Sequence, residues 1–325
     1  MTAGRGAPDT VSPAAGRHTQ LPRDVDDGPD LNLPTDTRAQ RLRRRLPAYL
    51  FIVPATAMVL VFLIWPFLRT ITLSLTNADG VNPPQFIGLA NYVRFLRDPI
   101  LIQSLTNTFI WLAASLVLPV VIGFLVAWGT YRLAGGALYR LPFILPYVLS
   151  GTAVGVVWSF LLQSDGVANE ILVTLGLDSL TRSWLLYPPH NTFAMIIAAT
   201  WQVVGINVIL FLVGLQAMPE DPVDAARVDG AQGWSLLRHI IIPLIRPMMV
   251  VVIGMTLVNS LRTFDIIWLM TQGGPYRSSE TLAVTMFREA FLLFRHGYGA
   301  AIAVLLTLFN LGAATLYLRR QLRSV

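Results

Sequence analysis

Long apolar stretches decide the solvent in which this chain folds. A transmembrane helix needs about 20 mostly apolar residues, and this sequence supplies six such stretches while only 13% of its 325 residues are charged. They cover residues 46–68, 105–131, 138–162, 192–215, 248–270 and 300–318. We therefore predict an all-α membrane protein with six transmembrane helices.

The basic residues narrow the function further. All 24 of them are arginine, whereas the phosphate-binding loop of P-loop ATPases requires a lysine. Any ATP-driven process must therefore take its energy through another chain. Cysteine is absent, which excludes disulfides and thiolate metal sites. The net charge of +6 is typical of a membrane protein with positive cytoplasmic loops, so we expect a lipid membrane and no nucleic acid among its partners.

Polar composition divides the chain into three parts. Residues 1–45 are poor in apolar clusters and cannot bury enough surface to fold alone, so we predict a disordered cytosolic tail. Residues 46–103 hold the first transmembrane helix and an external loop, and residues 104–320 hold the other five helices. More arginines flank the tail's side of the stretches than the opposite side. This bias predicts a multi-pass plasma-membrane protein with both termini and the 219–246 loop in the cytosol.

The 219–246 loop is charged and begins with helix-forming features. Pro222 suits a first helical turn, and Asp224 and Asp229 are expected near a helix N-terminus, where the helix dipole favours negative charge. Gly230 and Gly233 then permit a tight turn. These features predict a short helix followed by a turn.

An amphipathic helix is expected after the turn. Trp234, Leu237, Ile240 and Ile241 recur at helical spacing and form an apolar stripe, and Pro243 is expected to end this helix. Two interpretations stay open on the residues alone. The helix can lie at the membrane surface as an anchor or connector, or it can fit a groove on a cytosolic partner.

The same loop resembles the cytoplasmic loop shared by the inner-membrane permeases of ABC importers, which has Glu-Ala-Ala, three residues, Gly, nine residues and Ile-x-Leu-Pro. The positions that match this spacing are Asp224, Ala225, Ala226, Gly230, Ile240 and Pro243. Asp224 stands for Glu and Ile242 for Leu, so charge and bulk are kept. Residues 263–275 and 86–92 are similar to segments of carbohydrate permeases of this superfamily, and residues 184–191 and 297–305 to α-glucoside permeases.

This resemblance implies a type I ABC importer permease fold, with an ABC transmembrane type-1 domain over 104–320 and a cytoplasmic coupling-helix loop over 219–246. It implies sugar import, of an oligosaccharide or α-glucoside-like compound, by a chain that is not itself an enzyme. The implied partners are a second permease, two ATP-binding cassette subunits and an extracytoplasmic sugar-binding protein. This chain would bind no cofactor, since the partner ATPase uses the ATP. The implied ATPase-coupling residues are Asp224, Ala225, Ala226, Asp229, Gly230, Ile240 and Pro243.

Polar residues inside the apolar stretches are candidates for contact with the solute, because such groups usually face a cavity or another helix. Asn259, Arg262 and Asp265 recur at i, i+3 and i+6, close to one face of a continuous helix. The alternative is that Arg262 and Asp265 pair with each other and hold the helix. The other candidates are Gln202, Asn207, Trp201, Trp268, Asn107 and Trp111.

Two rival functions stay open. A secondary transporter driven by an ion gradient would need ionisable residues near the membrane midplane and no partner for the 219–246 loop. An ABC permease for a polyol or a glycerol-phosphate-type solute would share the architecture, and a phosphorylated solute would need cationic residues facing the cavity.

Overall fold

The computed structural model describes residues 52–261 and 263–322. The predicted disordered tail, residues 1–45, lies outside them. The chain divides into two units, Met1–Val59 and Leu60–Val325, and the second is named the helical unit. Its described residues form helices and one isolated bridge, between Thr76 and Phe86. The prediction of an all-α protein is confirmed for this part of the chain.

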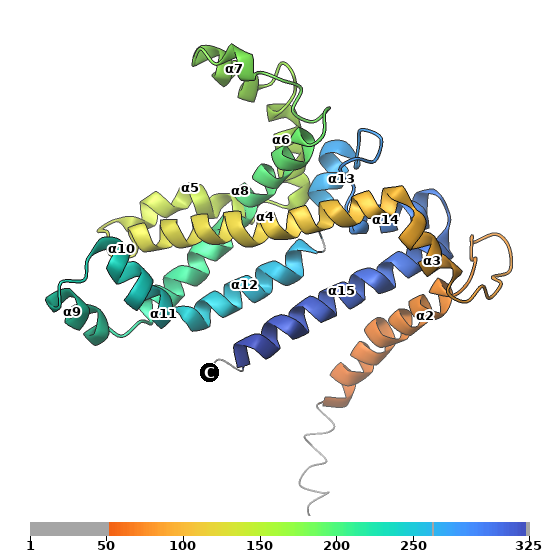
Figure 1. Ribbon diagram of the computed structural model, residues 1–325, viewed down its shortest axis with the longest axis horizontal. Coiled ribbons are helices and arrows are strands. Elements are labelled where there is room, and N and C mark those ends of the chain that lie inside the picture. The colour runs from red at the N-terminus through yellow and green to blue at the C-terminus, as the bar shows by residue number, and fades with distance from the viewer. Residues whose placement is uncertain (1–51, 262, 323–325) are drawn as a thin grey trace, which may run out of the picture. The chain divides into compact units, whose positions relative to one another are not determined.

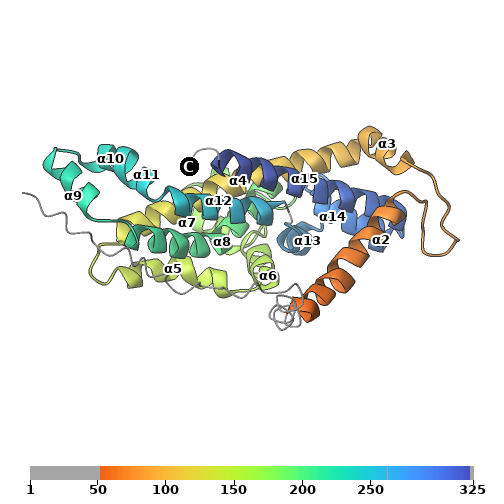
Figure 2. The same cartoon turned by 90° about the horizontal axis from the view of Figure 1, so that it is seen from below.

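The long helices of the unit are joined by shorter ones (Figure 1). The elements are η1 (Leu60–Ile64), α2 (Trp65–Ser74), α3 (Ala90–Arg97), α4 (Pro99–Thr130), α5 (Gly136–Val148), α6 (Gly151–Leu161), α7 (Val167–Thr174), η2 (Asp178–Leu180), α8 (His190–Gln216), α9 (Asp221–Val228), α10 (Gly233–Leu236), η3 (Leu237–Ile241), α11 (Ile242–Leu244), α12 (Arg246–Ser260), α13 (Asp265–Thr271), α14 (Leu282–Phe287), η4 (Arg288–Leu292) and α15 (His296–Leu322). Helix α4 packs against α5, α8 and α12, and Figures 1 and 2 both show it alongside α8.

Four helices among the described residues are long and apolar enough to cross a membrane: Ile52–Ser74, Pro99–Thr130, His190–Gln216 and His296–Gln321. Two further pairs are sharply bent. Gly136–Val148 and Gly151–Leu161 meet at 104°, and Gly233–Leu244 and Arg246–Ser260 meet at 75°. The described residues thus contain four spans by length and composition, or up to six if each bent pair is one span.

The third predicted span, 138–162, is not one straight helix. Pro146 cannot donate a backbone hydrogen bond, and the Ser150 side chain caps a new helix by accepting from the Ala153 amide at 3.1 Å. The exposed end of α5 is completed from another helix, because Gln202 Nε2 donates to the Leu149 carbonyl at 2.8 Å. These bonds stabilise the bend between α5 and α6.

The fifth predicted span, 248–270, is also interrupted. Helix α12 ends at Ser260, and α13 begins at Asp265. The Thr263 hydroxyl donates to the Ser260 carbonyl at 2.9 Å, and the Thr281 hydroxyl donates to the Thr263 carbonyl at 3.2 Å. Side-chain hydroxyls that bond to the backbone compete with the helical ladder, and here they accompany its end. The prediction of a continuous helix across these residues is wrong.

Two apolar clusters share α8. One contains residues 204–215 of α8 together with Val120 and Ala127 of α4 and side chains from α9, α10 and η3. The other contains residues 194–198 of α8 with Trp111 of α4, Val154 of α6 and part of α13. Helix α8 also lines a cavity, to which it contributes Ala199, Thr200, Gln202, Val203, Ile206, Asn207 and Leu210.

Candidate functional site

The turn after α9 has a defined hydrogen-bond motif. The Ala231 amide donates to the Ala226 carbonyl at 2.8 Å, and the Gly230 amide donates to the Arg227 carbonyl at 3.0 Å. These two bonds form a Schellman motif, which places the residue at the Gly230 position in the left-handed conformation. Gly230 has φ +87°, which glycine adopts without a steric penalty. The predicted turn at Gly230 is present.

One face of the 219–246 loop packs into the helical unit. Val223, Leu237, Ile241 and Ile245 are nearly or fully buried, in the cluster that contains α4 and α8. Ala226 is buried there too. Because interiors are close-packed, this contact fixes the loop firmly to two long helices.

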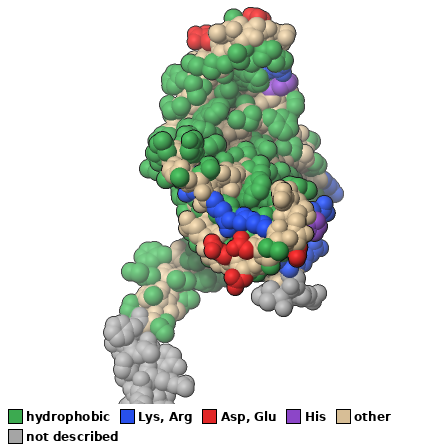
Figure 3. All heavy atoms as spheres, turned by 90° about the vertical axis from the view of Figure 1, so that its left-hand side faces the viewer, with side chains coloured by type: hydrophobic (Ala, Val, Ile, Leu, Met, Phe, Trp, Pro, Cys, Tyr) green, Lys and Arg blue, Asp and Glu red, His purple; other side chains and the backbone are tan. Residues whose placement is uncertain are grey.

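The opposite face of the loop is exposed. Trp234 is 68% and Val228 88% exposed, and an ion pair of 3.1 Å between Asp224 and Arg227 lies at the surface. Figure 3 shows acidic and basic side chains gathered at this end of the unit, below a surface that is largely hydrophobic. An exposed tryptophan and exposed charged side chains on one loop are the composition of a binding surface.

Three details of the predicted loop are wrong. Asp229 follows the last residue of α9, so of the two predicted carboxylates Asp224 lies in the first helical turn and Asp229 lies at the opposite end of the helix. Trp234 does not join the packed stripe, because the buried positions start at Leu236 and Leu237. Pro243 does not end the helix, since it occupies the first turn of α11 and the bend comes at Ile245.

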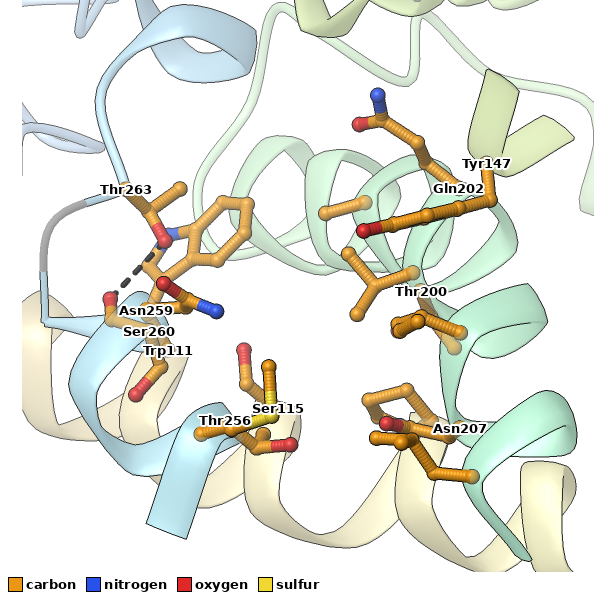
Figure 4. A pocket seen from close by; sticks show the side chains of 16 residues that line it. Trp111, Ser115, Tyr147, Thr200, Gln202, Asn207, Thr256, Asn259, Ser260 and Thr263 are labelled. Atoms are coloured by element: carbon orange, nitrogen blue, oxygen red, sulfur yellow. Dashed lines mark hydrogen bonds between the residues drawn. The ribbon is translucent and has the colours of Figure 1, made fainter. Parts of the chain in front are cut away.

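A cavity of about 260 Å³ lies between α4, α8 and α12. Figure 4 shows its polar side chains on opposite walls. The residues that line it are Trp111, Ser115, Pro119, Tyr147, Ala199, Thr200, Gln202, Val203, Ile206, Asn207, Leu210, Met255, Thr256, Asn259, Ser260 and Thr263. Hydroxyl, amide and indole groups supply the polarity of these residues, and the described lining contains no Asp, Glu, His, Lys or Arg.

Two buried donors on the cavity wall have no hydrogen-bond partner within the described residues. They are Nε1 of Trp111 and Nδ2 of Asn207, and both side chains are almost fully buried. A buried N–H group left unpaired costs about 1–3 kcal/mol. These two nitrogen atoms are themselves shielded from the cavity space, so the accessible polar groups of the lining include its hydroxyls and the amides of Gln202 and Asn259.

The predicted candidates divide between the cavity and other roles. Four residues predicted to contact the solute line the cavity: Gln202, Asn207, Asn259 and Trp111. Gln202 also caps the end of α5. The prediction missed Ser115, Tyr147, Thr200, Thr256, Ser260 and Thr263. The sequence signal for most of these residues was a serine or threonine within an apolar stretch. This signal is weak, because serine and threonine are common in membrane helices for packing alone.

Three other predicted residues lie away from the cavity lining. Trp201 packs edge-on against Trp158 with ring centroids 5.9 Å apart, and Trp268 stacks on Phe264. Asn107 donates to two carbonyls in the segment between α13 and α14. Their contacts are with other parts of the protein, so they are not among the residues that shape the cavity.

Asp265 belongs to a different helix from Asn259, so the predicted shared face does not exist. Asp265 instead lies beside the start of α6, since a Cβ atom at Gly151 would be 3.5 Å from Asp265 Cβ. Arg262 lies outside the described residues, and the alternative pairing of Arg262 with Asp265 stays a prediction.

Helices α4 and α8 approach each other closely at Gly123, beside Asn207. A larger side chain at Gly123 should therefore lower the stability of the protein. A Cβ at Gly123 would lie 2.6 Å from Asn207 Cβ, which forces the helices apart. We expect Gly123→Ala to destabilise the protein by about 1–3 kcal/mol, the usual cost of overpacking, and to lower the melting temperature in detergent. Gly129→Ala is the control on the same helix, since nothing lies within 4 Å of that position. Equal melting temperatures for the two variants would contradict the tight contact.

Comparisons with known proteins agree with this architecture. A probable ABC transporter permease protein of Pyrococcus horikoshii is 34% identical over 275 residues, which are 83% of this chain and 93% of that protein. The trehalose/maltose transport system permease protein MalF of Thermococcus litoralis is 31% identical over 287 residues, 87% of this chain and 96% of the relative. A chain of a bacterial alginate ABC transporter, solved with an alginate-bound periplasmic protein, has a similar fold, with a TM-score of 0.76 and 22% identity over 86% of this chain and 94% of its own.

The match to a protein family covers nearly all of the helical part. The family described as binding-protein-dependent transport system inner membrane component matches residues 44–320. This range contains the exposed loop at 219–246, the cavity and nearly all of each described long helix. The chain is therefore a member of the binding-protein-dependent transport system inner membrane component family.

Proposed function

We propose that this chain is the permease subunit of an ABC importer for a neutral sugar, an oligosaccharide of the α-glucoside kind. It forms half of the membrane path, and a second permease forms the other half. The observation that carries the proposal is the cavity, whose described lining combines hydroxyl and amide groups with aromatic rings and contains no charged side chain. A relative named for trehalose and maltose transport supports the same substrate class.

The cavity lining suits a sugar better than an ion. Sugar hydroxyls accept and donate hydrogen bonds, so they can meet the amides of Gln202 and Asn259 and the hydroxyl groups of the lining. Tyr147 supplies an aromatic ring at the wall, and aromatic rings pack on apolar sugar faces. Asn259, Gln202 and Asn207 are the residues we assign to the substrate path.

The 219–246 loop supplies the coupling to ATP. With the loop and both termini in the cytosol of a plasma-membrane protein, the exposed face of α9 and α10 enters a groove of one of two ATPase subunits. Gly230 provides the turn, Asp224 the polar contact, and Ile240 and Pro243 the packed continuation. This chain binds no cofactor itself, since the ATP is held by the partners.

The rivals find less support in the site. An ion-driven transporter needs charged side chains near the midplane, and the described cavity lining has none. A glycerol-phosphate permease needs a cation against its phosphate, which the described lining residues do not supply.

Purification and reconstitution test the proposal. The tagged chain, extracted in mild detergent, should bring with it a P-loop ATPase and a second permease. In liposomes the complex should take up radiolabelled maltose or trehalose only with ATP and the sugar-binding protein. Uptake under an ion gradient without ATP, by the chain alone, would make it a secondary transporter.

Removing one cavity donor should weaken transport without harming assembly. Asn259→Ala deletes an amide that lines the cavity, and one neutral hydrogen bond contributes about 0.5–1.5 kcal/mol. We expect uptake at low sugar concentration to fall about 2- to 10-fold. Asn310→Ala is the matched control, because this asparagine lies on α15 and does not line the cavity. A similar fall in both variants would indicate a packing effect instead.

A further inference from the structure

A second hollow of the helical unit lies between α12 and α15, and it is called here the α12–α15 groove. It has a volume of about 490 Å³, larger than that of the cavity described above. Its lining is apolar except for the Asn259 amide and the Tyr317 hydroxyl. That hydroxyl is already paired, because it donates to the carbonyl of Val250 at 2.9 Å. The groove thus offers an almost wholly apolar surface to an occupant.

The two helices that form the groove belong to the membrane-spanning part of the chain. Helix α15 lies in the candidate span His296–Gln321, and α12 is part of a bent pair that can form one span (Figure 1). Val251, Val258 and Leu318 line the groove and keep a third to a half of their surface exposed. In a membrane such side chains face lipid chains or another apolar helix.

One end of the groove is basic. The last groove-lining position of α15 is followed at once by Arg319 and Arg320, and Arg246 begins α12 about one helical turn before Val250. All three arginines are exposed. The hydrogen bond from Tyr317 to Val250 shows that these two helix ends lie together. Cationic side chains from both helices are therefore placed at the same end of the groove.

The positive charge at this end is not balanced from within the two helices. Neither α12 nor α15 contains an aspartate or a glutamate. Arg319 and Arg320 also form no ion pair with any other residue that the structure describes. Long arginine side chains can lay their methylene groups along an apolar surface while the guanidinium stays in the polar layer. The site thus combines an apolar groove with an end that attracts an anion.

We propose that the α12–α15 groove binds an anionic phospholipid, with an acyl chain along the apolar lining and the phosphate headgroup at Arg319 and Arg320. Guanidinium groups bind phosphate oxygens through charge-assisted hydrogen bonds, and basic pockets between membrane helices bind anionic headgroups. A zwitterionic lipid would bring its own cation to the same end. An apolar helix of another subunit would fill the lining but leave the arginine charges unmatched.

The groove and the cavity share part of α12. Met255 and Asn259 line both of them. A lipid chain in the groove therefore contacts two residues that also form the cavity wall. The inference itself depends on the groove and its charges, and it stands apart from the proposed transport of sugar.

Quenching by brominated lipids tests the site. The chain has no cysteine of its own, so Val251→Cys gives one position for a bimane fluorophore in the groove of the full-length chain. The labelled chain is placed in nanodiscs of phosphatidylcholine with a rising fraction of brominated phosphatidylglycerol or brominated phosphatidylcholine. Phosphatidylglycerol should quench at the lower fraction. A label at Val117→Cys, a similarly exposed valine on α4, is the control and should not distinguish the two headgroups.

Replacing the arginines tests the headgroup contact. Each basic side chain near the membrane surface should change the relative affinity for phosphatidylglycerol about 5-fold. The double variant Arg319→Gln/Arg320→Gln should therefore lose most of the headgroup preference while acyl chains still quench the label. Arg132→Gln, which removes an exposed arginine just beyond α4, should keep the preference. Both substitutions lie at exposed positions, so the fold is expected to tolerate them.

Filling the groove tests the acyl-chain contact. A Cβ atom at Gly254 would lie 3.4 Å from the Tyr317 ring, so the side chain of Gly254→Leu occupies space within the groove. We expect this variant to lose the quenching at the Val251→Cys label. Gly312→Leu is the control on α15, because nothing lies within 4 Å of that position and it does not line this groove.

Mass spectrometry of the intact complex, purified in mild detergent with the tagged chain, supplies the second measurement. The wild-type complex should retain an anionic phospholipid that the double arginine variant loses. Equal quenching by the two headgroups, unaffected by the arginine substitutions, would overturn the inference. A wild-type label that neither lipid quenches, or a complex without retained lipid, would show that protein covers the groove, which also overturns it.

Discussion

Replacing Trp234 with alanine should release the ATPase subunits while leaving the chain in the membrane. The indole is 68% exposed at the start of α10 and takes no part in the buried cluster that holds the loop. Its truncation therefore removes contact area for a partner and little internal packing. Interface tryptophans often contribute about 2 kcal/mol or more, so we expect roughly 30-fold weaker association or worse.

Co-purification of the ATPase with the tagged chain checks this result, with ATP-dependent sugar uptake as the second readout. Trp65→Ala is the matched control, since Trp65 is 63% exposed but lies on α2. It should retain the ATPase. Full recovery of the ATPase with Trp234→Ala would show that docking depends on other parts of the 219–246 loop.

Neutralising Glu280 should destabilise the protein strongly. Glu280→Gln keeps the shape of the side chain but leaves Arg277 and Arg288 without their shared carboxylate. Breaking a buried ion pair from one side costs about 3–5 kcal/mol when the remaining charge is buried and uncompensated. Arg277 keeps its contact with Glu289 and both arginines are partly exposed, so we expect a cost near the low end of this range. We expect a markedly lower melting temperature in detergent.

Thermal unfolding followed by tryptophan fluorescence measures the change. Glu170→Gln, at an exposed carboxylate on α7, should leave the melting temperature unaltered. An unchanged melting temperature for Glu280→Gln would mean that Arg277 and Arg288 find other partners and that this ion pair network contributes little to stability.

Helix positions were predictable because they depend on local composition, but the interruptions were not. The bend at Leu149 is completed by Gln202, and the end of α12 involves Thr281. Each contact joins residues far apart in the sequence, so no periodicity of the local stretch reports it. Pro146 marked a weak point in the third stretch, but a proline alone does not distinguish a kink from a complete bend.

The turn in the 219–246 loop could be predicted because it depends on neighbouring residues, whereas the cavity depends on contacts between residues distant in the sequence. The Gly230 turn follows from a motif within six residues, so its pattern was visible. Polar residues such as Asn107 and Asn207 look alike in sequence, yet one donates to a carbonyl 173 positions away and the other has an unpaired amide at the cavity. Only the packing of α4 against α8 separates these two roles.

The cluster that fixes the 219–246 loop has a mechanical consequence. Val223, Leu237 and Ile241 share one close-packed core with α4 and α8. Because this core deforms little, a displacement of the loop must displace α4 and α8 as well. Under the proposed coupling role, thermal stability and the transfer of force from the ATPase to α4 and α8 depend on the same side chains. Substitutions that loosen the packing of this core should raise the amount of ATP hydrolysed per sugar transported and also lower thermal stability. A substitution at these positions is therefore expected to change coupling and stability together.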